Sequence, residues 1–238
     1  MLENNQPKSS YHGYAITDFY KVDPRLGTLD DYIELSERCE ALGIRLVMDM
    51  VLNHCGSEHW WMKDLPDPDW INYHPDYKLT NHMRTTHQDP YAADSDRELM
   101  TRGWFVPTMP DMNVDHPLLR EYLIQNSIWW IEVLNLSGIR IDTYPYPGKA
   151  FSAEWCQRIL NEYPRLNMVG EEWSLNPLVV SYWQRGKENK DGYEGHLPTL
   201  FDFPSQNALL RSLTEERSWG SDFIYLYESL ANDFVYAN

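Results

Sequence analysis

The 238-residue sequence lacks any apolar run of the roughly 18 or more residues that a membrane-spanning helix needs, so it predicts no membrane span. Residues 1–7 also lack the apolar stretch that marks a secretory signal peptide. Cysteine is scarce: Cys39, Cys55 and Cys156 form no paired spacing, and their odd number favours free thiols over a disulfide framework. These absences favour a globular chain that folds without disulfide bonds.

Positive charge is also in short supply. The 20 Lys and Arg residues face 36 Asp and Glu residues, which gives a formal net charge of −16. Such a chain repels phosphate backbones and anionic lipids, so we expect neither nucleic acid nor membrane as a partner. Aromatic residues are abundant instead, at 14% of the sequence with 10 Trp and 16 Tyr. Their flat apolar faces suit a cleft that stacks on neutral ligands such as sugar rings.

Hydrophobic patterning predicts that strands and helices alternate along most of the chain. The predicted elements of the first half, in chain order, are a strand at 11–20, a helix at 28–43 with Thr28 as its N-cap, a strand at 44–51 buried on both faces, and a helix at 116–134. Those of the second half are a strand at 138–142, a helix at 152–163 with Ser152 as its N-cap, a strand at 168–171, a polar loop at 174–196, a strand at 197–203, a helix at 205–214, and a second helix or an irregular segment at 221–236. This order predicts an α/β fold with five parallel strands.

Residues 55–114 interrupt the alternation with a stretch rich in Pro, Asp, His, Asn and Trp. It is too long for an ordinary connection, so we predict a functional excursion or a small subdomain. Its histidines and the preceding His54 fit no recognised zinc-ligand spacing, which disfavours a structural zinc site. We therefore expect three segments, at residues 1–54, 55–114 and 115–238.

Two carboxylates stand where neighbouring strands are predicted to end. Asp142 closes the run from Gly138, Glu171 closes the run from Met168, and the helix between them makes a strand–helix–strand unit. The two strands of such a unit run parallel, so both carboxylates emerge at the same end of the sheet. Barrels of parallel strands keep their catalytic residues at that end. Two acids held about 5 Å apart are what a retaining glycosidase uses, one as nucleophile and the other as proton donor.

Each acid alone has a plainer structural explanation. Arg140 and Asp142 form an ordinary buried ion pair in many proteins, and an acid that ends a strand often only caps a helix. Asp49 and Asp142 are also candidate metal ligands of another type of barrel enzyme. Arg140 disfavours that reading, because it lies on the same strand face as Asp142 and a fixed cation opposes a bound metal.

Four short segments, in order, resemble the signature regions of the α-amylase family of retaining glycoside hydrolases. They are Asp-Met-Val-Leu-Asn-His at 49–54, Met-Pro-Asp-Met-Asn at 109–113, Gly-Ile-Arg-Ile-Asp at 138–142 and Gly-Glu-Glu-Trp at 170–173. The second is similar to the form found in neopullulanases and cyclomaltodextrinases, in particular the periplasmic enzymes of Bacteroides-like gut bacteria. The resemblance implies a partial TIM (β/α)8 barrel, about strands 2 to 6, with an irregular B-type subdomain inserted at 55–114. It also implies a periplasmic location for the whole protein.

The same resemblance assigns catalytic roles. Asp142 would be the nucleophile that forms a glycosyl ester, and Glu171 the general acid and later the general base. Arg140 would keep Asp142 charged and oriented. Glu171 needs a raised pKa to carry its proton, and we expect the neighbouring carboxylate and apolar neighbours such as Trp173 to provide it.

Roles in binding follow from the resemblance in the same way. His54 would hydrogen-bond the sugar at the reacting position, Tyr14 would stack beneath it, and Trp173 would complete the substrate site. Asp49 and Asn53 would order the surrounding loop. No organic cofactor is implied, and calcium is a candidate ion through Asn53, although no calcium-loop pattern is present.

Parts of the family pattern are absent. The sequence has no histidine–aspartate signature of the seventh barrel strand, no first strand before Tyr11 and no C-terminal β-domain, and residues 143–146 read Thr-Tyr-Pro-Tyr where many relatives end in Lys-His or Asn-Glu. We therefore expect an internal fragment, with little activity alone, of an enzyme that hydrolyses α-1,4 and, as an open question, α-1,6 glucosidic bonds. Open edges of an incomplete barrel leave backbone groups unpaired.

Two alternatives stay open. A transglycosylase or isomerase of the same family would use the same acids, and a non-catalytic relative would only bind glucan. The presence of both Asp142 and Glu171 argues against the latter. Linkage, chain length and oligomeric state are not fixed by these residues.

Overall fold

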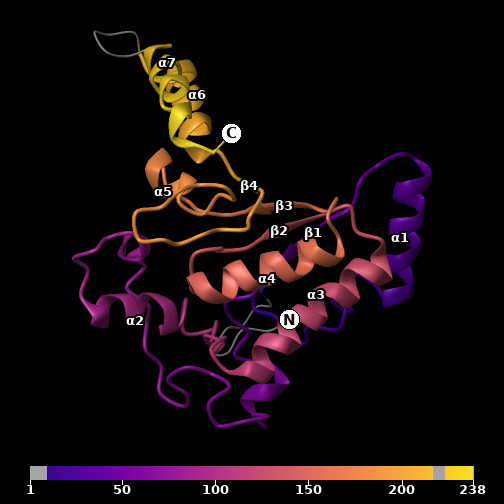
Figure 1. Ribbon diagram of the computed structural model, residues 1–238. Coiled ribbons are helices and arrows are strands. Elements are labelled where there is room, and N and C mark those ends of the chain that lie inside the picture. The colour runs from indigo at the N-terminus through magenta and orange to yellow at the C-terminus, as the bar shows by residue number, and fades with distance from the viewer. Residues whose placement is uncertain (1–9, 217–222, 238) are drawn as a thin grey trace.

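A computed structural model describes residues 10–216 and 223–237 (Figure 1). Its four strands are β1 (Val47–Met50), β2 (Gly138–Ile141), β3 (Asn167–Gly170) and β4 (Thr199–Leu200), which form one parallel sheet in the order β1-β2-β3-β4. The helices are α1 (Leu29–Ala41), α2 (Asp94–Arg102), α3 (Pro117–Leu134), α4 (Lys149–Glu162), α5 (Pro177–Ser181), α6 (Phe203–Thr214) and α7 (Ile224–Ala231), with short 3₁₀ helices η1 (Trp60–Met62), η2 (Arg84–His87) and η3 (Asp233–Val235).

The apolar core lies between the sheet and the helices that cross it. In Figure 1, α3 and α4 lie along one side of the sheet, with α1 beyond them. Ile139, Ile141 and Met168 of the strands are fully buried and share one cluster with Leu123 of α3 and Trp155 of α4. Full burial of one such side chain stabilises the fold by about 1.5–3 kcal/mol, so the packing of this face against the helices fixes the strands in place.

The helix predicted at 28–43 is confirmed, together with its ends. The Thr28 hydroxyl oxygen accepts from the Asp31 backbone N–H at 3.2 Å, and the Asp31 carboxylate accepts from the Thr28 N–H at 2.8 Å. This capping box satisfies N–H groups that the first helical turn leaves free. Gly43, with φ of 72°, ends the helix, because this left-handed conformation strains other residues. Leu35 of the helix and its C-cap residue Leu42 are exposed.

The strand predicted at 11–20 is wrong. This segment consists of bends and turns in the structure. Gly13 has a φ of 85°, and the Ile16 N–H donates to the Tyr14 carbonyl at 3.1 Å, which closes a tight turn that an extended strand cannot contain. Within residues 10–216 and 223–237 the sheet therefore has four strands, and the segment before α1 holds no barrel strand.

The strand predicted at 44–51 exists as β1, but the expectation that both its faces are buried is wrong. Val47 is 50% exposed. In the part of the chain that the structure describes, β1 pairs with β2 alone and forms an edge of the sheet. An edge strand lacks a neighbour to cover its outer side.

The later helices and strands differ from prediction mainly at their ends. α4 begins at Lys149 after Gly148, so Ser152 is not its N-cap; the buried Ser152 hydroxyl donates to the Tyr144 carbonyl instead, at 3.3 Å. Only residues 199–200 of the strand predicted at 197–203 pair with β3. α6 already begins at Phe203, because the Asp202 side chain accepts from the Ser205 N–H.

The remaining predictions hold with smaller corrections. The helix predicted at 116–134 is confirmed as α3, with proline in its first turn. The loop predicted at 174–196 contains the short helix α5. The helix predicted at 221–236 corresponds to α7 and η3, while its first two residues lie outside the described part. In Figure 1, α6 and α7 lie side by side and extend away from the sheet.

Residues 55–114 leave the sheet after β1 and return beside the same point. The Cys55 N–H donates to the Pro110 carbonyl at 3.1 Å, and the Met112 N–H donates to the Asn53 carbonyl at 2.9 Å. Apart from α2 and the two 3₁₀ helices, this inserted segment is irregular. The boundaries of the three segments stay a prediction.

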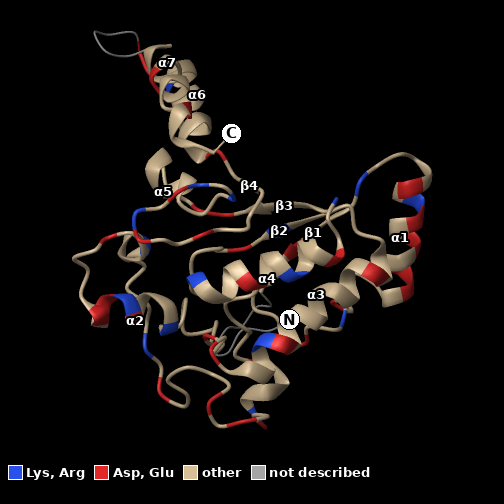
Figure 2. Ribbon diagram, viewed as in Figure 1, with Lys and Arg blue, Asp and Glu red and all other residues tan. Residues whose placement is uncertain are grey.

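Charged residues are spread over the surface elements. Figure 2 shows acidic positions on α1 and along the inserted segment, with basic positions scattered among them. In residues 10–216 and 223–237, no helix is both long and apolar enough to cross a membrane.

Candidate active site

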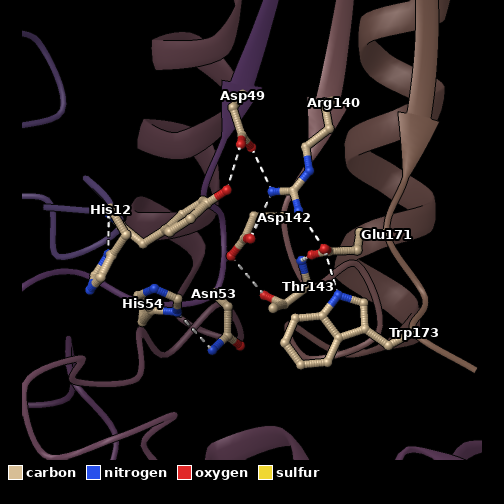
Figure 3. A network of polar contacts seen from close by, with 10 residues as sticks. His12, Asp49, Asn53, His54, Arg140, Asp142, Thr143, Glu171 and Trp173 are labelled. Atoms are coloured by element: carbon tan, nitrogen blue, oxygen red, sulfur yellow. Dashed lines mark hydrogen bonds and ion pairs between the residues drawn. The ribbon is translucent and has the colours of Figure 1, made fainter. Parts of the chain in front are cut away.

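The charged side chains of Asp49, Arg140, Asp142 and Glu171 project toward one another near the carboxyl ends of the strands (Figure 3). The register pairs Asp49 with Arg140 and Ile141 with Gly170, so Asp142 and Glu171 are the next residues of two paired strands. Neighbouring strands lie about 4.8 Å apart, and this spacing brings the two acids together. The predicted convergence of Asp142 and Glu171 at one end of the sheet is confirmed.

The guanidinium of Arg140 joins this cluster. Its Nη1 donates to Asp49 Oδ1 and to Asp142 Oδ1, both at 2.7 Å, and its Nη2 lies 2.5 Å from Glu171 Oε1. Burial opposes the charge, but the hydrogen bonds to Asp49 and Asp142 outweigh it and raise the pKa of Arg140. One permanent cation therefore faces three carboxylates, which goes beyond an isolated Arg–Asp pair.

Asp142 is almost fully enclosed, with 8% of its side chain exposed. Burial raises the pKa of Asp142 to about 6, and the hydrogen bond and charge of Arg140 oppose this rise. The carboxylate is thus mostly ionised at neutral pH and protonated in mild acid. Its second oxygen accepts from the Thr143 hydroxyl at 3.2 Å.

The surroundings of Glu171 differ from the apolar pocket that the sequence led us to expect. Trp173 Nε1 donates to Oε1 at 2.5 Å, the Thr143 backbone N–H donates to Oε2 at 3.0 Å, and Arg140 contacts Oε1. Trp173, about half exposed, thus acts on Glu171 through its N–H rather than as an apolar wall.

Tyr14 borders the cluster from the segment before α1. Its hydroxyl donates to Asp49 Oδ2 at 3.0 Å, and its ring centroid lies 5.7 Å from the guanidinium carbon of Arg140. Burial, followed by the charge of Asp49, raises the pKa of Tyr14 to about 12, so the hydroxyl keeps its proton. The ring is therefore fixed beside the acids by one hydrogen bond and one cation.

His54 and Asn53 follow β1 and are both buried. Burial lowers the pKa of His54 to about 3, so the imidazole is neutral. Its ring stacks against Phe105 of the inserted segment at 5.6 Å between centroids. Among the described residues, no side chain or backbone group pairs with His54 Nε2 or with Asn53 Oδ1. Buried polar atoms without a protein partner point to a ligand or water position.

Calcium has little support from this geometry. The ion takes six to eight oxygen ligands, and Asn53 Oδ1 is a single one. Nearby Asp111 is buried, which raises its pKa well above the usual range, and its Oδ2 accepts from Asn72 at 2.8 Å. In the described part of the chain, no three His, Cys, Asp or Glu side chains converge as a metal site would require.

The site contains a residue that the sequence did not identify as functional. Thr143 contacts both acids, Asp142 through its hydroxyl and Glu171 through its backbone N–H. Its φ of 43° is unusual for a β-branched residue and indicates backbone strain. Its place directly after Asp142 was the available signal, but a positive φ at threonine cannot be read from sequence.

The comparisons with known proteins agree on one family. A family model described as "Alpha amylase, catalytic domain" matches residues 4–211. The relatives include Alpha-amylase 3 of Dictyoglomus thermophilum, 26% identical over 232 residues, which cover 90% of this chain and 41% of that protein. Another is a cyclomaltodextrinase of Geobacillus thermopakistaniensis, 27% identical over 221 residues, which cover 90% of this chain and 33% of that protein.

A similar solved structure is an alpha-amylase from Geobacillus thermoleovorans, crystallised with acarbose. It has a TM-score of 0.77 and 26% sequence identity, and the match covers 100% of this chain and 47% of that one. The chain thus spans about two fifths of the length of the first of these relatives and less than half of this structure.

Proposed function

Because this chain belongs to the α-amylase family of glycoside hydrolases, we propose that it carries the nucleophile and the proton donor of an enzyme that cleaves α-glucosidic bonds with retention of configuration. The observation that carries the proposal is the pairing of Asp142 and Glu171 across one guanidinium, that of Arg140. Both carboxylates lie within 2.7 Å of that guanidinium, which supports the short separation that a covalent, double-displacement mechanism uses.

In the first step, a carboxylate oxygen of Asp142 attacks the anomeric carbon of the bound sugar. The glycosidic C–O bond breaks as Glu171 transfers its proton to the departing oxygen, which leaves as an alcohol. In the second step, water gives a proton to Glu171 and attacks the anomeric carbon, and the ester bond to Asp142 breaks. Both carboxyl groups return to their starting states, and two inversions give net retention.

The charges of the site fit this division of roles. Asp142 has a pKa of about 6 and is therefore mostly ionised at neutral pH, as a nucleophile must be. Glu171 must instead deliver a proton, and Arg140 and Trp173 both contact its Oε1. The glycosidic oxygen of a bound substrate takes the place of Arg140 at Glu171 Oε1. That exchange lets Glu171 direct its proton to the leaving group.

The remaining residues hold the sugar. His54 is neutral, and its unpartnered Nε2 is available to a sugar hydroxyl. The fixed ring of Tyr14 offers an apolar face to the reacting sugar, and the half-exposed ring of Trp173 offers another at the open side. The relatives are named for activity on starch-like or cyclic glucans, and we infer an α-glucan substrate for this protein as well.

A product analysis tests the proposal. The whole gene product and residues 1–238 alone are incubated with maltohexaose and with pullulan, which also contains α-1,6 bonds, and the new anomeric proton is followed by NMR. We expect the whole gene product to release α-anomers first and residues 1–238 alone to turn over slowly. Release of β-anomers, or no release by the whole gene product from either glucan, would contradict the proposal.

A further inference from the structure

Glu172, the residue after the proposed acid, is held on the opposite side of the chain. Side chains of successive residues in an extended segment point to opposite faces, so the side chain of Glu172 points away from that of Glu171. Its side chain is 0% exposed, and its Oε1 lies 2.7 Å from Nε of Arg84. The same oxygen accepts from the Ser174 backbone N–H at 3.1 Å. A buried carboxylate is thus anchored next to the proposed acid.

Arg84 reaches this position from the inserted segment, where it opens η2. Its charge also acts on the hydroxyl of Tyr146, where it opposes the rise in the pKa of Tyr146 that burial causes, and that hydroxyl lies 3.0 Å from His82 Nδ1. Tyr146 is buried and follows Asp142 by four positions, as Glu172 follows Glu171 by one. One arginine therefore holds the two loops that carry the proposed nucleophile and the proposed acid.

Arg84 and Glu172 stabilise each other because both charged groups are largely buried. Burial raises the pKa of Glu172, while the charge and hydrogen bond of Arg84 oppose that rise. Burial also opposes the charge of Arg84, and Glu172 and Tyr146 more than compensate, so the pKa of Arg84 is raised. Two charges this enclosed persist only as partners, because an unpaired one would be strongly destabilising.

The backbone around Glu171 has few other anchors. Residues 171–174 form neither helix nor strand. The Glu171 N–H donates to the Ile141 carbonyl at 3.0 Å, and the Glu171 carbonyl accepts from the Tyr144 N–H at 3.1 Å. Both hydrogen bonds connect Glu171 to the end of β2 and the segment that follows it. Beyond that point, the side chain of Glu172 supplies the tie to the inserted segment.

We infer that Arg84 is a positioning residue for the general acid: through Glu172 and Tyr146 it fixes the angle at which Glu171 meets the glycosidic oxygen. The inference rests on the proposed function. It links residues that are 88 positions apart in sequence, and it gives the inserted segment a part in proton transfer. Rate depends steeply on such alignment, since a proton must travel along a short hydrogen bond.

Substrates with different leaving groups distinguish a positioning role of Arg84 from a merely structural one. An oxygen leaving group needs the proton of Glu171, whereas the fluoride of an α-maltotriosyl fluoride departs as an anion while the bond to Asp142 forms. Loss of acid alignment should therefore slow cleavage of an oligosaccharide and spare the fluoride. Loss of folded protein should slow both equally.

The experiment compares kcat/KM of Arg84→Met on maltohexaose and on α-maltotriosyl fluoride, in the whole gene product. We expect a loss of about tenfold to a hundredfold on maltohexaose and less than about threefold on the fluoride, because Glu171 remains and only part of the roughly 10²- to 10⁴-fold contribution of general acid catalysis is lost. Glu172→Gln, which keeps the side-chain shape, should show the same selectivity with a smaller loss. Glu172→Gln still tests the positioning role if Arg84→Met does not fold.

Arg120→Met is the matched control. Arg120 is 27% exposed against 23% for Arg84, and it pairs with Glu154 at 2.9 Å between α3 and α4, away from both acids. We expect its two kcat/KM values to change by the same factor. Equal losses on both substrates in Arg84→Met and in Glu172→Gln, or no loss in either, would overturn the positioning role. A wild-type protein that cleaves neither substrate would overturn the proposed function itself.

Discussion

The two faces of β2 differ in what their burial achieves. Ile139 and Ile141 are fully buried toward the helices, while Arg140 and the following Asp142 are nearly as enclosed on the opposite face. Burial of the isoleucines stabilises the fold. Burial of the charged pair costs stability unless every charge is matched, and the same burial raises the pKa of Asp142 to about 6. The alternating side chains of β2 thus place residues that stabilise the fold on one face and the proposed catalytic residues on the other.

The two faces also differ in how their residues are stabilised. The apolar face depends on many similar contacts, so each residue contributes a part. The polar face depends on one guanidinium that serves Asp49, Asp142 and Glu171 together. Substitutions on the apolar face should change stability, and those on the polar face should change the rate.

Asp142→Asn should reduce kcat/KM on maltohexaose by on the order of 10⁴-fold or more, because the amide cannot form the ester. The folded protein should be no less stable. The pKa of Asp142 is raised above its unfolded value, so the stability tied to its proton is lost as pH rises through about 6, and a neutral amide avoids this loss. Steady-state kinetics and thermal melts at pH 7 measure both. A variant with more than a few per cent of the wild-type rate would break the comparison.

Arg140→Met should lower kcat/KM by about 10²- to 10³-fold, a loss typical of removing a fixed charge from an active site. The charge of Arg140 lowers the pKa of Asp142, so its removal leaves that group protonated up to a higher pH. The acid limb of the pH profile of kcat/KM, expected near pH 6 in the wild type, should move upward. A limb that stays in place or moves down would show that Asp142 does not govern it.

Ile141→Ala should destabilise the fold by about 2–5 kcal/mol, since it leaves a cavity in a fully buried position. Denaturant unfolding followed by circular dichroism gives this value. The rate per folded molecule should stay within about twofold of the wild type, because the side chain points away from the acids. A selective loss of rate without loss of stability would contradict the separation of the two faces.

Thr143→Val should have the smallest effect, a reduction in kcat/KM of about tenfold or less. The substitution keeps the branched shape and the backbone N–H that donates to Glu171, and it removes the hydroxyl that donates to Asp142. Loss of that donor should also move the acid limb slightly upward. Kinetics between pH 5 and 8 test both; an unchanged rate and profile would show that the hydroxyl contact has no catalytic role.

Much of this arrangement was predictable from local patterns. The α-amylase family and the partial barrel, both expected from four short segments, are confirmed by the family model and the structural match. The alternation in residues 138–142 placed Arg140 and Asp142 on one face, as observed. The capping of α1 by Thr28 was equally readable, because both partners lie within four residues.

The failures share a physical cause: they depend on contacts between distant segments. The strand predicted at 11–20 had the right residue types, but the turn at Gly13–Ile16 keeps it out of the sheet, and β1 stays an edge strand in the described structure. Ser152 had the right type for an N-cap, yet its helix begins three residues earlier. The donors around Glu171 and the tie between Arg84 and Glu172 bring together residues whose proximity no local pattern encodes. The catalytic and binding roles of the site residues stay predictions.

A trapping experiment tests the central claim most directly. A 5-fluoro-α-glucosyl fluoride forms the glycosyl ester readily but releases it slowly, since the second fluorine disfavours positive charge at the reacting carbon. Digestion and mass spectrometry of the labelled whole gene product then locate the ester. We predict a single adduct on the peptide that carries Asp142, absent in Asp142→Asn. An adduct on another residue, or turnover without any adduct, would contradict the assignment of Asp142 as the nucleophile.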